Sequence, residues 1–433
     1  MSERKLSQVS YRDLWAQFFP LALSDVTMAL GDPLVNVTLA HLPEARVSLA
    51  AMGIAKSQAV FFESPIIMLL HASNALAEKM GARQALYQFT FILTAFLTLL
   101  CAVFCWDPVF QKIAVDTMGV APELAQNARR ALSILILWPA VIGWRRVFQG
   151  LLIHHGFGSA IGRASLARAV ALASLLYLGF QIQLDPVTLA AGATMIGLLC
   201  ELAFVVRSAA IHDLIWIPDN SGPKMSLCAL FKFYWPLGNS MIVVWGGRAL
   251  LTAVVAQAAD GSLALAAWPA VWGVVLLIAN STRMVQQITI RHRHHLESKR
   301  LLLFAGSVGL VFTFVLAAIG YGPMSKSWLH FFIGNDSELY LSALPVLQIC
   351  ILIPLMVALQ NCLQGLLIGD HRTNWVNMAT WLGTTTLLIT SFYMIKSGFP
   401  GATSAAVAMS SAIFVELTWL AYGYWSLIES RVR

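Results

Sequence analysis

The stretch Gln149-Gly150-Leu151-Leu152-Ile153 decides the fold, because the same five residues recur in the second half of the chain as Gln364-Gly365-Leu366-Leu367-Ile368. We call the distance along the chain from Gln149 to Gln364 the repeat spacing. A proline precedes each copy by ten residues, Pro139 in the first case and Pro354 in the second. Near the start of each half, Gly31 corresponds to Gly247 with a shift of one residue. Several matches at one spacing indicate an internal duplication, in which each copy builds the same unit.

The composition places both copies in a membrane. Of the residues, 58% are hydrophobic and only 11% are charged, with a mean hydropathy of +0.72, whereas soluble domains carry about 25% charged residues. The apolar runs are long enough to cross a hydrocarbon layer of about 30 Å, which takes about 20 helical residues. They lack the alternation of barrel strands. The sequence therefore predicts an all-α membrane protein.

Twelve spans are predicted, six in each copy. They cover residues 14–40, 48–78, 84–106, 126–153, 160–183, 187–212, 230–258, 262–290, 301–321, 340–368, 374–396 and 402–428. Six is an even number, so both copies enter the membrane from the same side and the repeats are parallel. We expect an N-terminal bundle at 1–212, a cytoplasmic linker at 213–229 and a C-terminal bundle at 230–433.

The distribution of lysine and arginine gives the orientation. One set of loops holds Lys79, Arg83, Arg163, Arg207, Lys224, Arg291, Arg293, Lys299, Arg300 and Arg372. The opposite loops hold mainly Arg46, Lys112, Lys326 and Lys396. Since positive loops stay in the cytoplasm, both termini are predicted to be cytoplasmic, in a cell (inner) membrane. This signal accounts for the net charge of +7, so no nucleic-acid partner is expected.

The sequence offers little for catalysis or metal binding. It has no GxxxxGK[ST] phosphate loop and no GxSxG or HExxH motif, so neither an ATPase nor another enzyme is expected. The six cysteines form no CxxC pair. The histidines of the segment 291–295 are interleaved with arginines, which repel a metal ion. No cofactor or metal is therefore predicted.

Several strings resemble the progressive ankylosis protein family of the multidrug, oligosaccharidyl-lipid and polysaccharide (MOP) exporter superfamily, whose fold is MATE-like. They are Arg129-Arg130-Ala131 with Pro139 and Gly150, Ile211-His212-Asp213 with Ile217-Pro218-Asp219, and Phe233-Tyr234-Trp235-Pro236-Leu237. The resemblance implies export of small anions such as pyrophosphate, nucleotide or citrate. The chain lacks the long polar C-terminal tail of animal members, which leaves the solute open.

Ionisable side chains inside the spans are the candidate site residues, because each costs roughly 2.5 to 3.5 kcal/mol to insert. The residues expected to bind an anionic solute are Arg248, Arg283, Arg145, Arg146, Lys56, Asn36, Gln149 and Gln364. Arginine suits phosphate and carboxylate because its fork donates paired hydrogen bonds. The carboxylates expected to carry coupling ions are Asp25, Asp32, Glu63 and Glu416.

Structural interpretations of the same residues compete with these functional ones. Asp25 and Asp32 are seven residues apart and would share a helix face, and the next span could place Lys56 against Asp32 as an ion pair. Glu201 and Glu416, equivalent in the repeat, could extend to the interface from helix ends. One of the adjacent Arg145 and Arg146 could serve only the orientation signal.

Competing functions also stay open. The leading hypothesis is a secondary exporter of a small polyanion that alternates access between two bundles. With the same fold, the cargo could be a lipid-linked saccharide or a cationic drug. A membrane scaffold is disfavoured by the intramembrane charges, and an intramembrane enzyme by the lack of a catalytic constellation. The oligomeric state is open, and a monomer is the simplest expectation.

Overall fold

The computed structural model describes residues 9–29, 31–77, 81–117, 122–215, 225–255, 257–322, 325–327, 329 and 337–432. Throughout these ranges the regular structure is helical, without a strand. Most of the predicted linker 213–229 lies outside them. The prediction of an all-α protein is confirmed for the described part of the chain.

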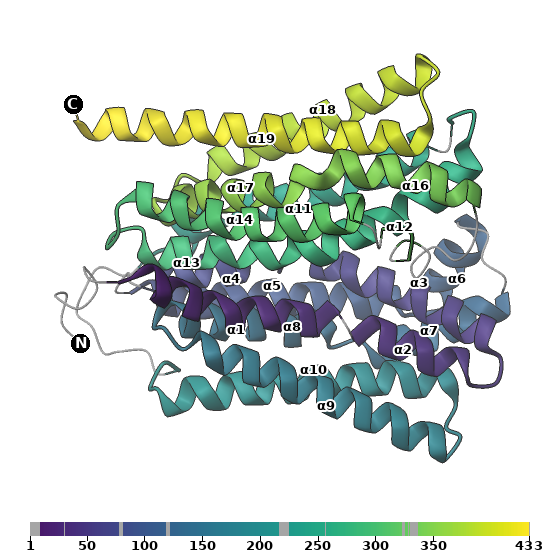
Figure 1. Cartoon of the computed structure of the whole chain (residues 1–433). Coiled ribbons are helices and arrows are strands. Elements are labelled where there is room, and N and C mark those ends of the chain that lie inside the picture. The colour runs from purple at the N-terminus through teal and green to yellow at the C-terminus, as the bar shows by residue number, and fades with distance from the viewer. Residues whose placement is uncertain are drawn as a thin grey trace. The chain divides into compact units, whose positions relative to one another are not determined.

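The helices follow one another along the chain as Figure 1 shows. In the first half they are α1 Tyr11–Ala29, α2 Gly31–Ala40, α3 Ala45–Glu63, α4 Leu69–Leu76, α5 Ala82–Phe104, α6 Asp107–Gln111 with a π-turn Lys112–Thr117, α7 Pro122–Ile134, α8 Trp138–His154, α9 Gly158–Gln181 and α10 Pro186–Ile211. In the second half they are α11 Leu227–Val255, α12 Gly261–Ala279, a 3-10 turn η3 Asn280–Arg283, α13 Met284–His292, α14 Ser298–Tyr321, α16 Ser337–Ile349, a 3-10 turn η4 Cys350–Leu352, α17 Ile353–Gly369, α18 Thr373–Lys396 and α19 Gly401–Val432.

Grouped at their short breaks, the long helices reproduce the twelve predicted spans. Within the described ranges, nine helical stretches are long and apolar enough to cross a membrane. In the other three spans, α1 and α2 lie on either side of residue 30 in the first, α3 and α4 belong to the second, and α12, η3 and α13 to the eighth. Asp25 lies on α1 and Asp32 on α2, and their predicted common face stays a prediction.

Contacts divide the chain into two compact units. One is Leu23–Tyr234, and the other joins the first residues up to Ala22 to Trp235–Arg433. The start of α1 packs within the second unit, where the Phe18 and Phe304 rings lie 6.2 Å apart and Arg291 donates to Gln17 at 2.6 Å. The predicted bundle boundaries at 212 and 230 stay predictions.

The breaks within spans four and ten are related by the repeat spacing of the sequence. A turn over residues 135–137 separates α7 from α8, and η4 at Cys350–Leu352 separates α16 from α17 at the equivalent place in the second copy. Pro139 and Pro354 are each the second residue of the helix that follows. Both copies therefore interrupt the helix just before the equivalent proline.

Proline chemistry explains both turns. Proline has no N–H to give to the carbonyl four residues earlier. In the first copy the Leu135 carbonyl accepts instead from the Trp138 N–H at 2.8 Å. In the second copy the Cys350 carbonyl accepts from the Ile353 N–H. Each turn therefore tightens so that the residue just before the proline satisfies the released acceptor.

The recurring glycine of the Gln-Gly-Leu-Leu-Ile stretch allows two helices to approach closely. A Cβ on Gly150 of α8 would meet the Leu70 carbonyl oxygen of α4 at 2.6 Å, and one on Gly365 of α17 would meet the Gln286 carbonyl oxygen of α13 at 2.8 Å. Close approach through small residues is a common way to pack membrane helices. The repeated motif is thus explained by packing against α4 and α13.

Hydrogen bonds reinforce the same two contacts. Ser73 of α4 donates to the Val147 carbonyl at 2.7 Å, and Thr289 of α13 lies 3.6 Å from the Cys362 sulfur. Val147 and Cys362 are again equivalent at the repeat spacing. The two units therefore share the packing of their second and fourth spans in detail.

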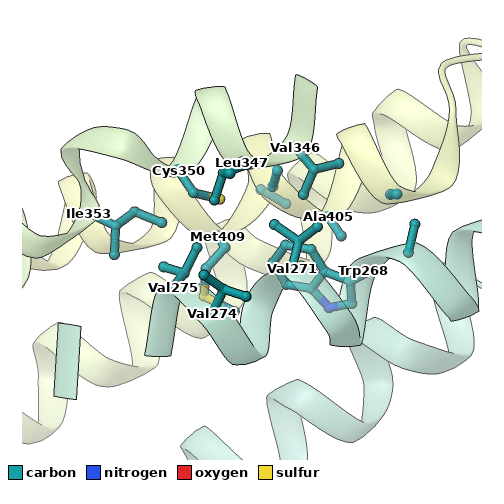
Figure 2. Packing of buried hydrophobic residues seen from close by; sticks show 14 of the residues in the cluster. Trp268, Val271, Val274, Val275, Val346, Leu347, Cys350, Ile353, Ala405 and Met409 are labelled. Atoms are coloured by element: carbon teal, nitrogen blue, oxygen red, sulfur yellow. The ribbon is translucent and has the colours of Figure 1, made fainter. Parts of the chain in front are cut away.

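An apolar cluster within the second unit joins α12, α16, α17 and α19 (Figure 2). Trp268, Val271 and Val275 of α12 pack there with side chains of α16, α17 and α19. Ala405, with no exposed surface, and Met409 come from α19. In a membrane such a cluster gains mainly from dispersion contacts and shape, because lipid tails are as apolar as the side chains.

Gly150→Ala should destabilise the protein by about 1 to 3 kcal/mol, the range for overpacking, because the new Cβ collides with a backbone carbonyl of α4. The matched control is Gly192→Ala in α10, where a Cβ meets nothing within 4 Å and the higher helix propensity of alanine favours the variant. Thermal unfolding in detergent measures both. Equal melting temperatures for the two variants would refute the close-packing role of Gly150.

Candidate functional site

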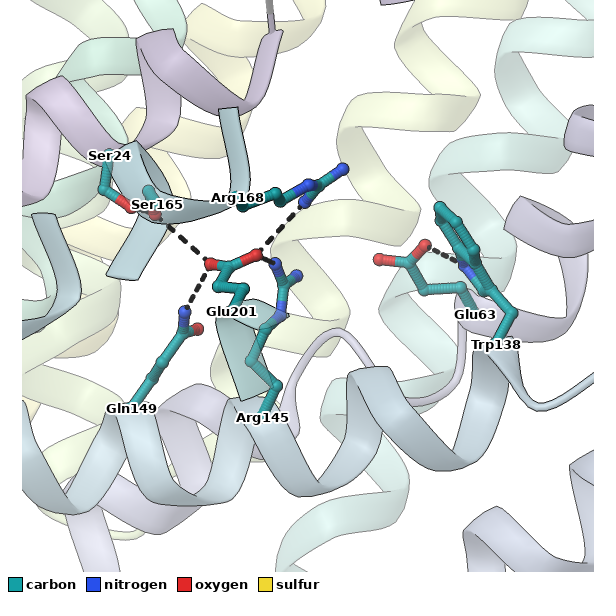
Figure 3. A network of polar contacts seen from close by, with 8 residues as sticks. All are labelled: Ser24, Glu63, Trp138, Arg145, Gln149, Ser165, Arg168 and Glu201. Atoms are coloured by element: carbon teal, nitrogen blue, oxygen red, sulfur yellow. Dashed lines mark hydrogen bonds and ion pairs between the residues drawn. The ribbon is translucent and has the colours of Figure 1, made fainter. Parts of the chain in front are cut away.

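A buried carboxylate organises the polar interior of the unit Leu23–Tyr234 (Figure 3). Glu201 of α10 accepts from Arg145 of α8 at 2.5 Å and from Arg168 of α9 at 3.2 Å. The Arg145 and Glu201 side chains are each only 1% exposed. Because an unpaired charge at this depth is expensive, the ion pairs tie α8, α9 and α10 to one another.

Neutral donors complete the surroundings of Glu201. Gln149 donates to its other oxygen at 3.3 Å, and the Ser165 hydroxyl donates there at 3.2 Å. Ser165 in turn lies 2.6 Å from the hydroxyl of Ser24 on α1. Both carboxylate oxygens of Glu201 are therefore occupied, and the network draws on four helices.

This geometry corrects the interpretation of Glu201 as an end charge that extends to the interface. Glu201 lies ten residues before the end of α10, which is about 15 Å along a helix, and it is buried. The hydropathy pattern misplaced it because it does not show how far a charge lies from its helix end. The expected ligands Arg145 and Gln149 both contact this carboxylate, so their solute-binding role stays a prediction.

The remaining candidates of the first unit are spread over several helices. Lys56 and Glu63 are half-buried on α3, and Lys56 interacts electrostatically with Arg168 and Glu63. The Trp138 indole donates to Glu63 at 2.9 Å. Two further candidates differ in exposure: Arg146 is half-buried and Asn36 is exposed. Asp25 is half-buried on α1, and the side chain of Asp32 lies outside the described part of the structure, as does its expected pairing with Lys56.

The equivalent carboxylate of the second unit, Glu416 on α19, has different neighbours. Gln360 of α17 donates to it, at the position that Arg145 holds in the first copy. Gly383 of α18 stands where the first copy has Arg168, and a Cβ there would collide with the Glu416 carboxylate. In the second copy, an amide therefore stands in place of one guanidinium partner, and a glycine without a side chain in place of the other.

Arg248 brings positive charge close to Glu416, and Arg283 lies close enough to Arg248 to interact with it. Arg248 is half-buried on α11, and its guanidinium carbon lies 5.4 Å from the Trp245 ring centre. It interacts electrostatically with both Arg283 and Glu416. Arg283 is exposed at the end of η3. Gln364, the remaining candidate, accepts from Gln286 at 3.3 Å.

Sequence reasoning missed Arg168, Gln360 and Gly383. Arg168 is recognised only once the structure shows it in contact with Glu201. Gln360 and Gly383 then follow, because they lie at the repeat spacing from Arg145 and Arg168. The informative positions are those at which the two copies differ.

The basic segment 291–295 packs within the second unit, where buried His292 lies 2.9 Å from Gln17.

Most of the chain, including the first unit and Arg248, matches a known protein family. Residues 2–280 match the family model described as progressive ankylosis protein (ANKH). The chain belongs to the progressive ankylosis protein family. The match includes the whole Glu201 network and Arg248, whereas Arg283 and Glu416 lie beyond it.

The fold of this family member is similar to that of several solved structures. It is similar to a MOP superfamily transporter from Pyrococcus furiosus, with a TM-score of 0.78 and 14% identity over 98% of both chains. A multidrug resistance MATE transporter in an outward-facing conformation gives a TM-score of 0.77 with 15% identity over 99% of both chains. A MATE protein in a bent conformation gives 0.80 with 15% identity over the full length of both chains.

Family and fold together set what is shown for this protein. It belongs to the progressive ankylosis protein family, its described helices are long and apolar enough to cross a membrane several times, and its fold is similar to that of MATE and other MOP superfamily transporters. The predicted family and fold class are confirmed.

Removing the first carboxylate should cost far more stability than removing its equivalent. Glu201→Gln leaves Arg145 and Arg168 without their counter-charge, and breaking a buried pair costs about 3 to 5 kcal/mol. Glu416→Gln replaces a group held by one neutral amide and should cost clearly less. Unfolding in detergent compares the variants, and a larger loss in Glu416→Gln would contradict the geometry.

Proposed function

We propose that this family member is a secondary transporter that exports a small polyanionic metabolite of the pyrophosphate, nucleotide or citrate type. The observation behind the proposal is Arg248, a half-buried guanidinium that shares its surroundings with a second arginine, Arg283. Two like charges in the spanning part of one bundle repel each other. An anionic ligand relieves that repulsion, which favours a polyanion as cargo.

The balance of charge around Arg248 supports this choice. Among the described residues near it, Glu416 is the carboxylate that acts on Arg248, and Gln360 already donates to that carboxylate. Arg248 therefore interacts with one negative charge and with the like charge of Arg283. A solute with several oxygens can take paired hydrogen bonds from an arginine fork, which an ammonium group does not offer.

The membrane potential supplies a driving force for export. We place the protein in a cell (inner) membrane with both termini on the cytoplasmic side. That side of the membrane is electrically negative. Each elementary charge that crosses gains or loses about 2.3 kcal/mol per 100 mV, so a polyanion is driven outward without ATP. We propose that the bundles 1–212 and 230–433 alternate access to the solute, and that a monomer suffices.

The polarity of the site also differs among proteins of this fold. The similar transporter from Pyrococcus furiosus is described as having a binding pocket of reverse polarity that suggests a different function. A change of cargo within one fold requires a change in the charge of the site rather than of the helices. Arg248 and Arg283 are candidates for such a change here.

Arg248→Ala should abolish anion uptake into liposomes that contain the purified protein, because it removes the guanidinium that faces the anion. Arg248→Lys keeps the charge but loses the fork, so it should retain part of the uptake. Labelled citrate, pyrophosphate and nucleotide are measured in parallel, each with a potassium diffusion potential of either sign. A potential that is positive inside the liposomes should raise the rate of anion uptake, and a negative one should lower it.

Arg372→Ala is the matched control, since Arg372 is exposed in the loop between α17 and α18. Its uptake should equal that of the unsubstituted protein. Undiminished uptake in Arg248→Ala would disprove the site. If no anion moves but a cationic drug or a lipid-linked saccharide does, the function itself is one of the alternatives within the superfamily.

A further inference from the structure

The two equivalent glutamates of the repeat differ in how their charge is balanced. Glu201 contacts Arg145 and Arg168 directly. A carboxylate between two guanidiniums is held in its ionised form by both charges. Glu201 is therefore a fixed structural charge, and proton exchange there would break the contacts among α8, α9 and α10.

Glu416 lacks both of these partners. Its hydrogen-bond donor is the neutral amide of Gln360, and Gly383 leaves room for its side chain where the other copy has an arginine. An amide can donate to an ionised carboxylate and can equally accept from a protonated one. The surroundings of Glu416 thus accommodate both protonation states without a change of partner.

The helices packed against α19 carry few other titratable groups. Those helices are α12, α16, η4, α17 and α18. Their charged or phenolic side chains are Glu338 and Tyr340 in the first turn of α16 and Tyr393 and Lys396 in the last turn of α18, and their thiols are Cys350 and Cys362. Lys396 lies thirteen residues beyond Gly383, about 20 Å along the helix. Arg248 of α11 is the charged group that acts on Glu416.

We propose that Glu416 is the exchangeable proton site of this transporter, and that its ionised carboxylate competes with the solute anion for Arg248. The competition rests on the proposed function. When Glu416 is ionised, it neutralises Arg248 and weakens the attraction for the anion. When Glu416 takes a proton at its carboxylate oxygen, Arg248 loses that counter-charge and attracts the anion more strongly.

Proton and anion therefore bind together, and each raises the affinity of the other by the same factor. The carrier moves them in the same direction. One proton cancels only one of the several charges of a polyanion, so the membrane potential still favours exit of the loaded carrier. The same site thus limits how much charge leaves per turnover.

Anion binding measured against pH tests the competition. In the purified protein, pyrophosphate affinity should rise as the pH falls, by up to about tenfold per pH unit for one linked proton. Calorimetry in buffers of different ionisation enthalpy should show proton uptake on binding. Glu416→Gln should lose the part of both effects that the protein contributes. The protonation of pyrophosphate itself is common to both proteins and cancels in the difference between them.

Gln360→Arg supplies a second, independent variant. It places at Glu416 the partner that Glu201 has in the other copy, so the carboxylate remains but should stay ionised. The pH slope should fall as in Glu416→Gln. Glu297→Gln is the control, because Glu297 is an exposed carboxylate at the start of α14 without a side-chain cap, and it should keep the slope of the unsubstituted protein.

A slope in Glu416→Gln or Gln360→Arg equal to that of the unsubstituted protein would overturn the proposal. If the protein binds no anion, the proposed function fails, and the proton site is tested separately by infrared spectroscopy. The band of a protonated carboxyl group should then titrate in the protein and in Glu297→Gln but be absent from Glu416→Gln. Persistence of that band in Glu416→Gln would rule out Glu416 as the proton site.

Discussion

The contact of Glu201 with Arg145 and Arg168 is the interaction on which the unit Leu23–Tyr234 depends. It places one negative and two positive charges in the spanning part of three helices, with a glutamine and a serine completing the hydrogen bonds. Such a group fixes helix rotation, because each guanidinium must point at one carboxylate. Where lipid offers no hydrophobic drive for association, this directionality selects one packing among many.

The two copies share one arrangement of helices but surround their equivalent glutamates with different partners. The glycine contacts of α8 with α4 and of α17 with α13 preserve the backbone arrangement in both copies, as do the turns before Pro139 and Pro354. On that common backbone, an arginine in the first copy becomes Gln360 in the second. A structural ion pair thereby becomes a carboxylate with a neutral partner, while the positive charge is supplied from elsewhere by Arg248.

Much of the fold was predictable from the sequence, because hydropathy and the repeat spacing are local or periodic signals. The twelve spans and the duplication follow from them. The site was less predictable. Arg168 and Gln360 matter only through partners 33 and 56 residues away, and helix rotation decides whether such side chains meet. Glu201 was misread as an end charge for the same reason, since burial depends on neighbours that hydropathy does not describe.

The distance along the chain between Arg145 and Glu201 has a consequence for biosynthesis. The arginine leaves the ribosome 56 residues before its partner, and each charge alone costs roughly 2.5 to 3.5 kcal/mol in the bilayer. The fourth span is apolar enough to cross a membrane, but its arginine bears this cost until the sixth span brings the carboxylate. The ion pair therefore forms only after the sixth span has been made. The packing of this half of the protein is completed late in its synthesis.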